Sequence, residues 1–231
     1  MITTDNPTIV GISVNMLNAF NSYRLAKKIK EKFPEKIIIA GGLHTFDEPE
    51  EVAKQRFDIT FVGESEISLV KFFRLIGQQK KPIEPNLLTK IAFREELQLI
   101  PGLIINQQNK LFDTGHYEIL DNLDELPVIN PDFLNLDDFI RTPLDHYRST
   151  NFLNFQRGCP FKCTFCKAEF MGGKVRSNSA DYIVRTLKQT HEKYGQTNFF
   201  LTDSNFTIPS PRVVEFCNKN ISSGMNKKIN F

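Results

Sequence analysis

The sequence lacks the features that mark membrane, secreted and disulfide-stapled proteins. No apolar run of about 18 residues occurs, so we expect no membrane span. The segment Met1–Asp5 has no basic stretch followed by an apolar core, which argues against a signal peptide. Only four cysteines are present, and three of them are clustered, which suits a reducing cytoplasm better than a disulfide framework. We therefore expect a cytoplasmic protein without a membrane partner.

Strong charge of either sign is also missing. The chain has 29 basic and 27 acidic residues and a formal net charge of +2, which does not point to a nucleic-acid partner, and we expect none. With 40% hydrophobic and 24% charged residues among 231, the chain is globular in class. Its length is enough for one large or two modest domains.

What the chain does have is three cysteines in one short stretch. Cys159, Cys163 and Cys166 follow the spacing C-x3-C-x2-C. A loop this short can point three thiolates at one soft metal centre with little loss of chain entropy. Gly158 and Pro160 suit a backbone that bends tightly around an inorganic group. Structural zinc sites and most four-iron clusters take four protein ligands, whereas three cysteines on a four-iron cluster would leave one iron open for chemistry.

Two alternatives to an iron–sulfur cluster are a zinc site and a purely structural group of cysteines. A zinc site would need a fourth ligand such as His191 or Cys217, and neither lies at the close spacing of a zinc ribbon or finger. Cys217 falls on the apolar side of a predicted helix, so we expect a small core residue there. His191 is expected to be a packed histidine on a helix face.

The cysteine stretch resembles the cluster loop of radical S-adenosylmethionine (SAM) enzymes, a family marked by CxxxCxxC with an aromatic residue before the last cysteine. Phe165 has that position here. The resemblance implies that Cys159, Cys163 and Cys166 bind a 4Fe–4S cluster, that SAM chelates the open iron, and that Phe165 lies near the adenine. It further implies a reductant such as flavodoxin or ferredoxin, reductive cleavage of S-adenosyl-L-methionine, and a radical that attacks a small-molecule or unidentified substrate.

The first part of the chain predicts an alternating α/β unit. Apolar runs at 8–14, 36–40 and 57–62 are typical of buried parallel strands, and the patterns at 19–33, 49–56 and 66–76 predict helices. Ligands of such sheets bind beyond the carboxyl ends of the strands. These ends carry Ser13, Gly41, Gly42, Gly63 and Glu64. Glycines there either let a bulky ligand approach or simply form turns.

Taken together, Val10–Val14, Ile39–His44 and Phe61–Glu66 resemble the latter half of the cobalamin-binding domain that precedes many radical SAM barrels. The resemblance implies a partial doubly wound, flavodoxin-like domain over residues 1–82. In it Ser13, Gly41 and Gly42 would line the groove for the nucleotide tail of cobalamin, and Gly63 and Glu64 would lie in the following loop. The D-x-H-x-x-G motif, whose histidine ligates cobalt in that family, is absent, as are its first strands. His44 is expected to be solvated, with contact to a corrin or substrate as the alternative.

Residues 83–150 predict a linker that contains a hairpin at 99–112, with acidic residues that form a solvated face. Residues 151–231 predict the first strands of a partial radical SAM (β/α) barrel, with the cluster loop after the first strand. The expected strands are 151–156, 198–203 and 228–231, and a helix is expected between Ser179 and Gly195.

Two further residues of this region are candidates for the SAM pocket. Arg176 could form a forked contact with the SAM carboxylate, or it could pair with surface acids. Asp203 ends a predicted strand, and Asp203–Phe206 resembles a D-D-x-F-like stretch that lies near SAM or substrate in the family. The alternative for Asp203 is an Asx turn between strand and helix.

These features predict the front portion of a cobalamin-domain radical SAM enzyme, incomplete at both ends, of methyltransferase or oxidative cyclase type. The alternative is a catalytically inactive remnant or binding module that keeps the cluster loop or the cobalamin-type domain. A methylthiotransferase is disfavoured, because its N-terminal domain would carry cysteines and none precedes Cys159.

Overall fold

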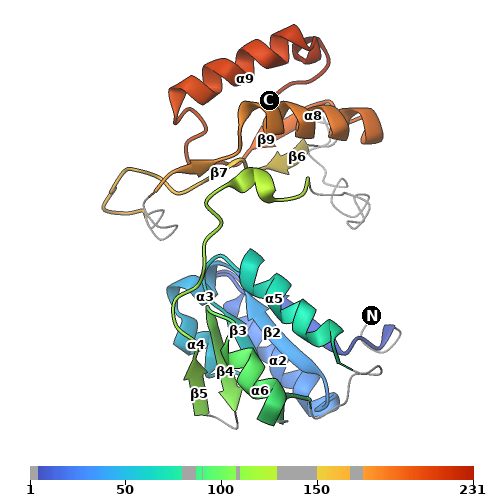
Figure 1. Cartoon of the computed structure of the whole chain (residues 1–231), viewed down its shortest axis with the longest axis vertical. Helices are drawn as coiled ribbons and strands as arrows, with labels where there is room; N and C mark the ends of the chain where they lie inside the picture. The colour runs from blue at the N-terminus through green and yellow to red at the C-terminus, as the bar shows by residue number, and fades with distance from the viewer. Residues whose placement is uncertain (1–4, 80–86, 90, 108–109, 129–149, 167–173) are drawn as a thin grey trace. The chain divides into compact units, whose positions relative to one another are not determined.

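The computed structural model describes residues 5–79, 87–89, 91–107, 110–128, 150–166 and 174–231 (Figure 1). The chain divides into two compact units, Met1–Leu120 and Asp121–Phe231, each with its own sheet and core. In the parts of the chain that are described, no helix has both the length and the apolar character that a membrane crossing requires.

The first unit is built on a five-stranded sheet in the order β1-β2-β3-β4-β5 (Figure 1). Strands β1 (Ile9–Ser13), β2 (Ile37–Gly41) and β3 (Ile59–Phe61) are parallel, as the apolar runs predict. Strands β4 (Leu103–Gln107) and β5 (Lys110–Asp113) continue the sheet in antiparallel orientation.

Helices cover both faces of this sheet. Its helices are α2 (Ala19–Lys32), α3 (Leu43–Asp47), α4 (Pro49–Ala53), α5 (Glu66–Gly77), α6 (Ile91–Gln98) and the 3-10 turn η1 (Leu87–Thr89). On one face, Ile38 packs with Ala26 of α2 and Val52 of α4. On the other, Ile39 packs with residues of α5 and α6. A strand that is buried on both sides shows a continuous apolar run instead of alternation, which is why β2 could be recognised from the sequence.

The hairpin predicted at 99–112 exists as β4 and β5, but its assignment to a linker is wrong. Leu103–Ile105 pair with Ile59–Phe61 of β3, so the hairpin extends the first sheet. Helix α6 precedes it and was not predicted. Phe93 and Leu97 are buried one helical turn apart and join the core that contains Ile59 and Phe61. The first unit therefore extends to Leu120 and not to residue 82.

The second unit pairs two parallel strands, β6 (Thr150–Leu153) and β9 (Asn198–Leu201). A single parallel bridge joins Asn198 to Asn230, where the next strand was predicted. Beside them, β7 (Gln156–Arg157) and β8 (Arg176–Ser177) form a short antiparallel ladder. Helices α8 (Ala180–Tyr194) and α9 (Ser210–Ser222) and the turns η2 (Leu123–Glu125) and η5 (Met225–Lys227) complete the unit.

Both predicted ends of helix α8 are confirmed. The Ser179 hydroxyl accepts a hydrogen bond from the Tyr182 N–H at 3.1 Å, and Gly195 ends the helix with a left-handed φ of 66°. Asp124, expected on a solvated face, adds a second cap, because its Oδ1 accepts from the Ser179 N–H at 2.9 Å and from Asn178 Nδ2 at 3.1 Å. Burial alone would raise the pKa of Asp124, but these hydrogen bonds and the charge of Arg185 outweigh it and lower the pKa.

Asp124→Ala is expected to destabilise the second unit by about 1 kcal/mol near pH 7, the usual magnitude for a lost helix cap. Because the folded state lowers the pKa of Asp124, its contribution is present above the unfolded value of 3.8 and is lost as the pH falls through the folded value. Urea unfolding near pH 7 and near pH 3 should therefore show a difference that shrinks in acid. Asp121→Ala is the control, since its 3.2 Å ion pair with Lys174 is solvent-exposed. An equal loss in both variants would contradict the capping role.

Candidate functional site

The loop that carries the clustered cysteines is anchored at both ends by the β7–β8 ladder, in which Gln156 faces Ser177 and Arg157 faces Arg176. Gly158 begins the loop with a φ of 80°, a conformation that favours glycine. None of the three cysteines of the loop is in a disulfide; Cys159 is half-buried, and Cys163 and Cys166 are exposed. The Cys166 N–H donates to the Cys163 carbonyl at 2.9 Å, which closes a turn between the last two.

The loop carries thiols, which are suitable ligands for an iron–sulfur cluster, although its described side chains are not grouped as metal ligands. Within the described ranges no three His, Cys, Asp or Glu side chains lie close enough to hold a metal ion. Three reduced cysteines on one loop, anchored at both ends, still fit a 4Fe–4S cluster with one open iron. Phe165 is 90% exposed beside Cys166 and is not packed in the core. The assignment of these residues as ligands and as an adenine contact stays a prediction.

Asp203, just after β9, and Arg176, in β8, are the two residues predicted for the SAM pocket. The Phe155 N–H donates to Asp203 Oδ1 at 2.8 Å, while Asp203 Oδ2 is buried and has no hydrogen-bond partner among the described residues. Burial raises the pKa of Asp203, against the opposing effects of the Phe155 hydrogen bond and the charge of Arg212. Arg176 is buried, with 4% of its surface exposed. A role of either residue in binding SAM stays a prediction.

At the carboxyl edge of the first sheet, the predicted groove residues divide into two kinds. Ser13 is exposed, and a side chain at Gly41 would meet no atom within 4 Å, so both positions are open. Gly42 has a φ of 113°, and a Cβ there would lie 2.6 Å from the Val14 carbonyl oxygen. At Gly63 the space is filled by the ring of Tyr117, 2.5 Å from a built Cβ. Glycine at positions 42 and 63 therefore makes room for other residues of the protein, Val14 and Tyr117. Glu64 directly follows Gly63.

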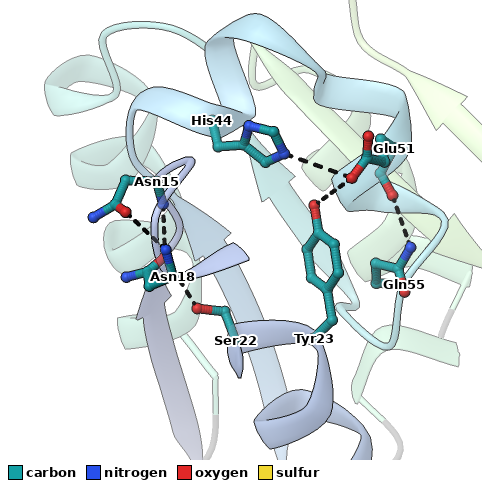
Figure 2. A network of polar contacts seen from close by, with 7 residues as sticks. All are labelled: Asn15, Asn18, Ser22, Tyr23, His44, Glu51 and Gln55. Carbon is teal, nitrogen blue, oxygen red and sulfur yellow. Dashed lines mark hydrogen bonds and ion pairs between the residues drawn. The ribbon is translucent and has the colours of Figure 1, made fainter. Parts of the chain in front are cut away.

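The expectation that His44 is solvated is wrong. Its side chain is 12% exposed, and Nε2 lies 3.6 Å from Oε1 of Glu51 (Figure 2). The same oxygen accepts a 2.9 Å hydrogen bond from the Tyr23 hydroxyl, and burial together with Glu51 raises the pKa of Tyr23. His44 Nδ1 is buried without a partner in the part of the chain that is described. The histidine thus links α3 to α4 and α2 at this edge.

Next to this group, a rigid turn presents apolar side chains to solvent. Asn15 Oδ1 accepts from the N–H groups of Leu17 and Asn18, and Asn18 Oδ1 accepts from the Asn15 N–H (Figure 2). Leu17 is 94% exposed as a result. Other large apolar side chains exposed around the ends of β1 and β2 are Met16, Phe20 and Leu43. Sequence reasoning missed this feature, although Met16-Leu17 directly after a strand and before a helix was its signal.

The predictions for Cys217 and His191 have different outcomes. Cys217 was expected in the core, but it is exposed on α9, because the buried face of that helix follows Arg212, Phe216 and Asn220 at four-residue spacing. The prediction for His191 is confirmed: its ring Nδ1 lies 2.8 Å from the Gln196 carbonyl oxygen, as a packed side chain at the end of α8.

The fold and the cysteine loop define a two-unit α/β protein with a candidate iron–sulfur centre in its second unit. Residues 153–226 match the family model of the radical SAM superfamily, which confirms the resemblance to radical SAM enzymes. Such a domain implies a 4Fe–4S cluster and SAM as cofactors. The match includes the cysteine loop, Arg176, Asp203 and the whole of α9.

Comparison with curated proteins gives methyltransferases and a cyclase as similar proteins. The chain is 25% identical over 217 residues to the uncharacterized methyltransferase PH0819 of Pyrococcus horikoshii, covering 91% of this chain and 42% of that protein. It is 25% identical over 220 residues to an anaerobic magnesium-protoporphyrin IX monomethyl ester cyclase of Rubrivivax gelatinosus (94% and 37%). It is 32% identical over 195 residues to the hopanoid C-3 methylase of Methylococcus capsulatus (83% and 34%). Both predicted enzyme types thus occur among its relatives, of which the chain spans about two fifths or less.

A solved structure supports the fold. The radical SAM methyltransferase TsrM of Kitasatospora setae, determined with cobalamin and a [4Fe-4S] cluster bound, superposes with a TM-score of 0.66 at 15% identity. The superposition covers 94% of this chain and 42% of TsrM. The mixed α/β fold with parallel strands is therefore shared with that enzyme.

Proposed function

We propose that this chain provides the SAM-cleaving centre of a radical SAM enzyme of methyltransferase or oxidative cyclase type. The observation that carries the proposal is the loop of three reduced cysteines, held by β7 and β8, inside the residues that match the radical SAM family. Cys159, Cys163 and Cys166 would hold a 4Fe–4S cluster, which when bound supplies the electron that cleaves SAM. The chain's own part is to hold these thiolates and to keep the remaining iron open to SAM.

The neighbouring residues suit the binding of a charged, aromatic cofactor. Phe165 presents an exposed ring beside Cys166, where an adenine could stack. Asp203 keeps one buried carboxylate oxygen available to a donor group such as an ammonium or hydroxyl. We further propose a small-molecule substrate, a cytoplasmic setting and a flavodoxin- or ferredoxin-type reductant.

We also propose the carboxyl edge of the first sheet as a site for cobalamin, which would direct the chemistry toward methyl transfer. Ser13 and Gly41 are open there, and Met16, Leu17 and Leu43 expose apolar surface at the same edge, which suits a large flat ring. Gly63 lies under Tyr117, so Gly63 and Glu64 would contribute less directly to this site than the sequence predicts.

The alternative is a binding module without catalytic activity, and one experiment separates the two. Anaerobic reconstitution with iron and sulfide should give about four irons per chain, and the EPR spectrum of the reduced protein should change when SAM is added. No cluster, or zinc retained in its place, would overturn the proposed function. A cluster whose spectrum ignores SAM would instead favour the binding module.

A further inference from the structure

Arg212 is a charged residue in the interior of the second unit that no sequence motif singles out. It lies in the first turn of α9, yet it is only 7% exposed. A buried guanidinium is weak support for stability, because its desolvation offsets much of what its contacts gain. Its Nε is also buried without a partner in the described part of the chain. Stability alone therefore does not explain why Arg212 is buried.

The contacts of Arg212 point to one segment, the backbone that leads into the cysteine loop. Nη1 donates to the Phe155 carbonyl at 3.4 Å, and Nη2 donates to Gln156 Oε1 at 3.4 Å. Nη2 also donates to the Phe206 carbonyl at 2.7 Å, and the guanidinium lies 4.7 Å from the centroid of the Phe206 ring. The planar fork of arginine presents five donors in a fixed geometry, which the single ammonium group of lysine does not reproduce.

Gln156 connects Arg212 to the backbone just before the first cysteine of the loop. Its side chain is buried, and while Oε1 accepts from Arg212, Nε2 donates to the Gly158 carbonyl at 3.5 Å. Gly158 is the residue directly before Cys159 and has the left-handed φ of 80°. The three groups form a relay from the Arg212 guanidinium through the Gln156 amide to the Gly158 carbonyl.

Both backbone groups of Phe155 form further hydrogen bonds. Its N–H donates to Asp203 Oδ1 at 2.8 Å, and its carbonyl accepts from the Asn178 N–H at 2.9 Å in addition to Arg212. The segment before the loop therefore has a rigid base, and Gln156 provides the link from this base to Gly158.

We propose that Arg212 and Gln156 are positioning residues for the cysteine loop: Arg212 orients the Gln156 amide, which holds the Gly158 carbonyl and so fixes the place of Cys159. The inference deepens the proposed function, and its link to a cluster rests on that function. The relay itself is a property of the protein without a cluster, and it can be tested there.

The test is the backbone motion of Gly158 in the full chain without cluster. Arg157-Gly158 is the only Arg-Gly pair in the sequence, so labelling arginine with 13C and glycine with 15N identifies its amide signal directly. We expect the order parameter of Gly158 to be that of rigid backbone, about 0.85, and to fall below about 0.6 in Arg212→Lys and Gln156→Glu. Gln156→Glu keeps an acceptor for Arg212 and replaces the donor to Gly158 by a carboxylate oxygen, so it breaks the contact with Gly158 while the Arg212 contact is kept.

Internal and matched controls make the result specific. Gly195 and Gly224 lie in the same unit and should keep their order parameters in every variant. Arg185 is also stacked on an aromatic ring, 5.2 Å from the Tyr182 centroid, but is exposed on α8, so Arg185→Lys should leave Gly158 rigid.

Two outcomes would overturn the relay. One is a Gly158 that stays rigid in both relay variants, and the other is a loss of order at Gly195 and Gly224 together with Gly158, which would mean a structural role only. With the relay confirmed in the apoprotein, reconstituted Gln156→Glu should lose its iron to a chelator about tenfold faster than the wild type, as expected for one lost hydrogen bond. A wild-type chain that takes up no iron would refute the proposed function, while the glycine data would still decide the relay.

Discussion

Cys159→Ala, Cys163→Ala and Cys166→Ala are each expected to reduce the iron bound after reconstitution from about four atoms per chain to nearly none. Each thiolate would hold a different iron, and among the described residues no other group of three His, Cys, Asp or Glu side chains could hold a metal in its place. Iron and sulfide analysis together with the visible absorbance of the cluster measures the loss. Because Cys163 and Cys166 are exposed, their variants should unfold within about 0.5 kcal/mol of the wild type.

Cys217→Ala is the matched control for these variants. It removes a thiol from the same unit, and this thiol is exposed on α9 outside the loop. It should bind as much iron as the wild type. Loss of iron in Cys217→Ala would point to a site with four cysteine ligands and would contradict the proposed open iron. Full iron in any of the three loop variants would refute the ligand assignment of that cysteine.

Local patterns in the sequence were enough to predict most helices and strands. Continuous apolar runs identified β1, β2 and β3. Strands β2 and β3 are buried at almost every position, and such strands need apolar residues throughout, whereas β1 lies at the edge of the sheet and is only partly buried. Ser179 and Gly195 marked the ends of α8 through chemistry that acts within a few residues. The cysteine loop was found in the same way, from spacing alone.

Features that depend on distant partners could not be read from the sequence. The hairpin was placed in a linker because nothing in Leu103–Ile105 shows that these residues pair with β3. Gly63 was assigned to a loop of the cobalamin site, while the residue that fills its space, Tyr117, lies far along the chain. Arg212 had no local signal, since an arginine in the first turn of a helix is most often solvated.

The second large effect is expected at Gly42, where alanine should destabilise the first unit by roughly 2–5 kcal/mol. Gly42 has φ 113° and ψ −178°, a backbone region that is almost restricted to glycine. An added Cβ would also lie 2.6 Å from the Val14 carbonyl oxygen, which accepts a hydrogen bond from the His44 N–H and cannot move freely. Because the chain has no tryptophan, urea unfolding is best followed by circular dichroism.

Gly41→Ala, one residue away, is the matched control and should unfold almost as the wild type does, since its Cβ would meet no atom within 4 Å. The same open space is what a corrin would need, so Gly41→Ala should weaken binding of hydroxocobalamin about tenfold while the fold is kept, if this edge is the cobalamin site. Equal stability of Gly42→Ala and the wild type would contradict the strained backbone at the end of β2. Hydroxocobalamin that fails to bind the wild-type chain would leave the first unit as a scaffold, and the methyl-transfer proposal would then fail for this chain.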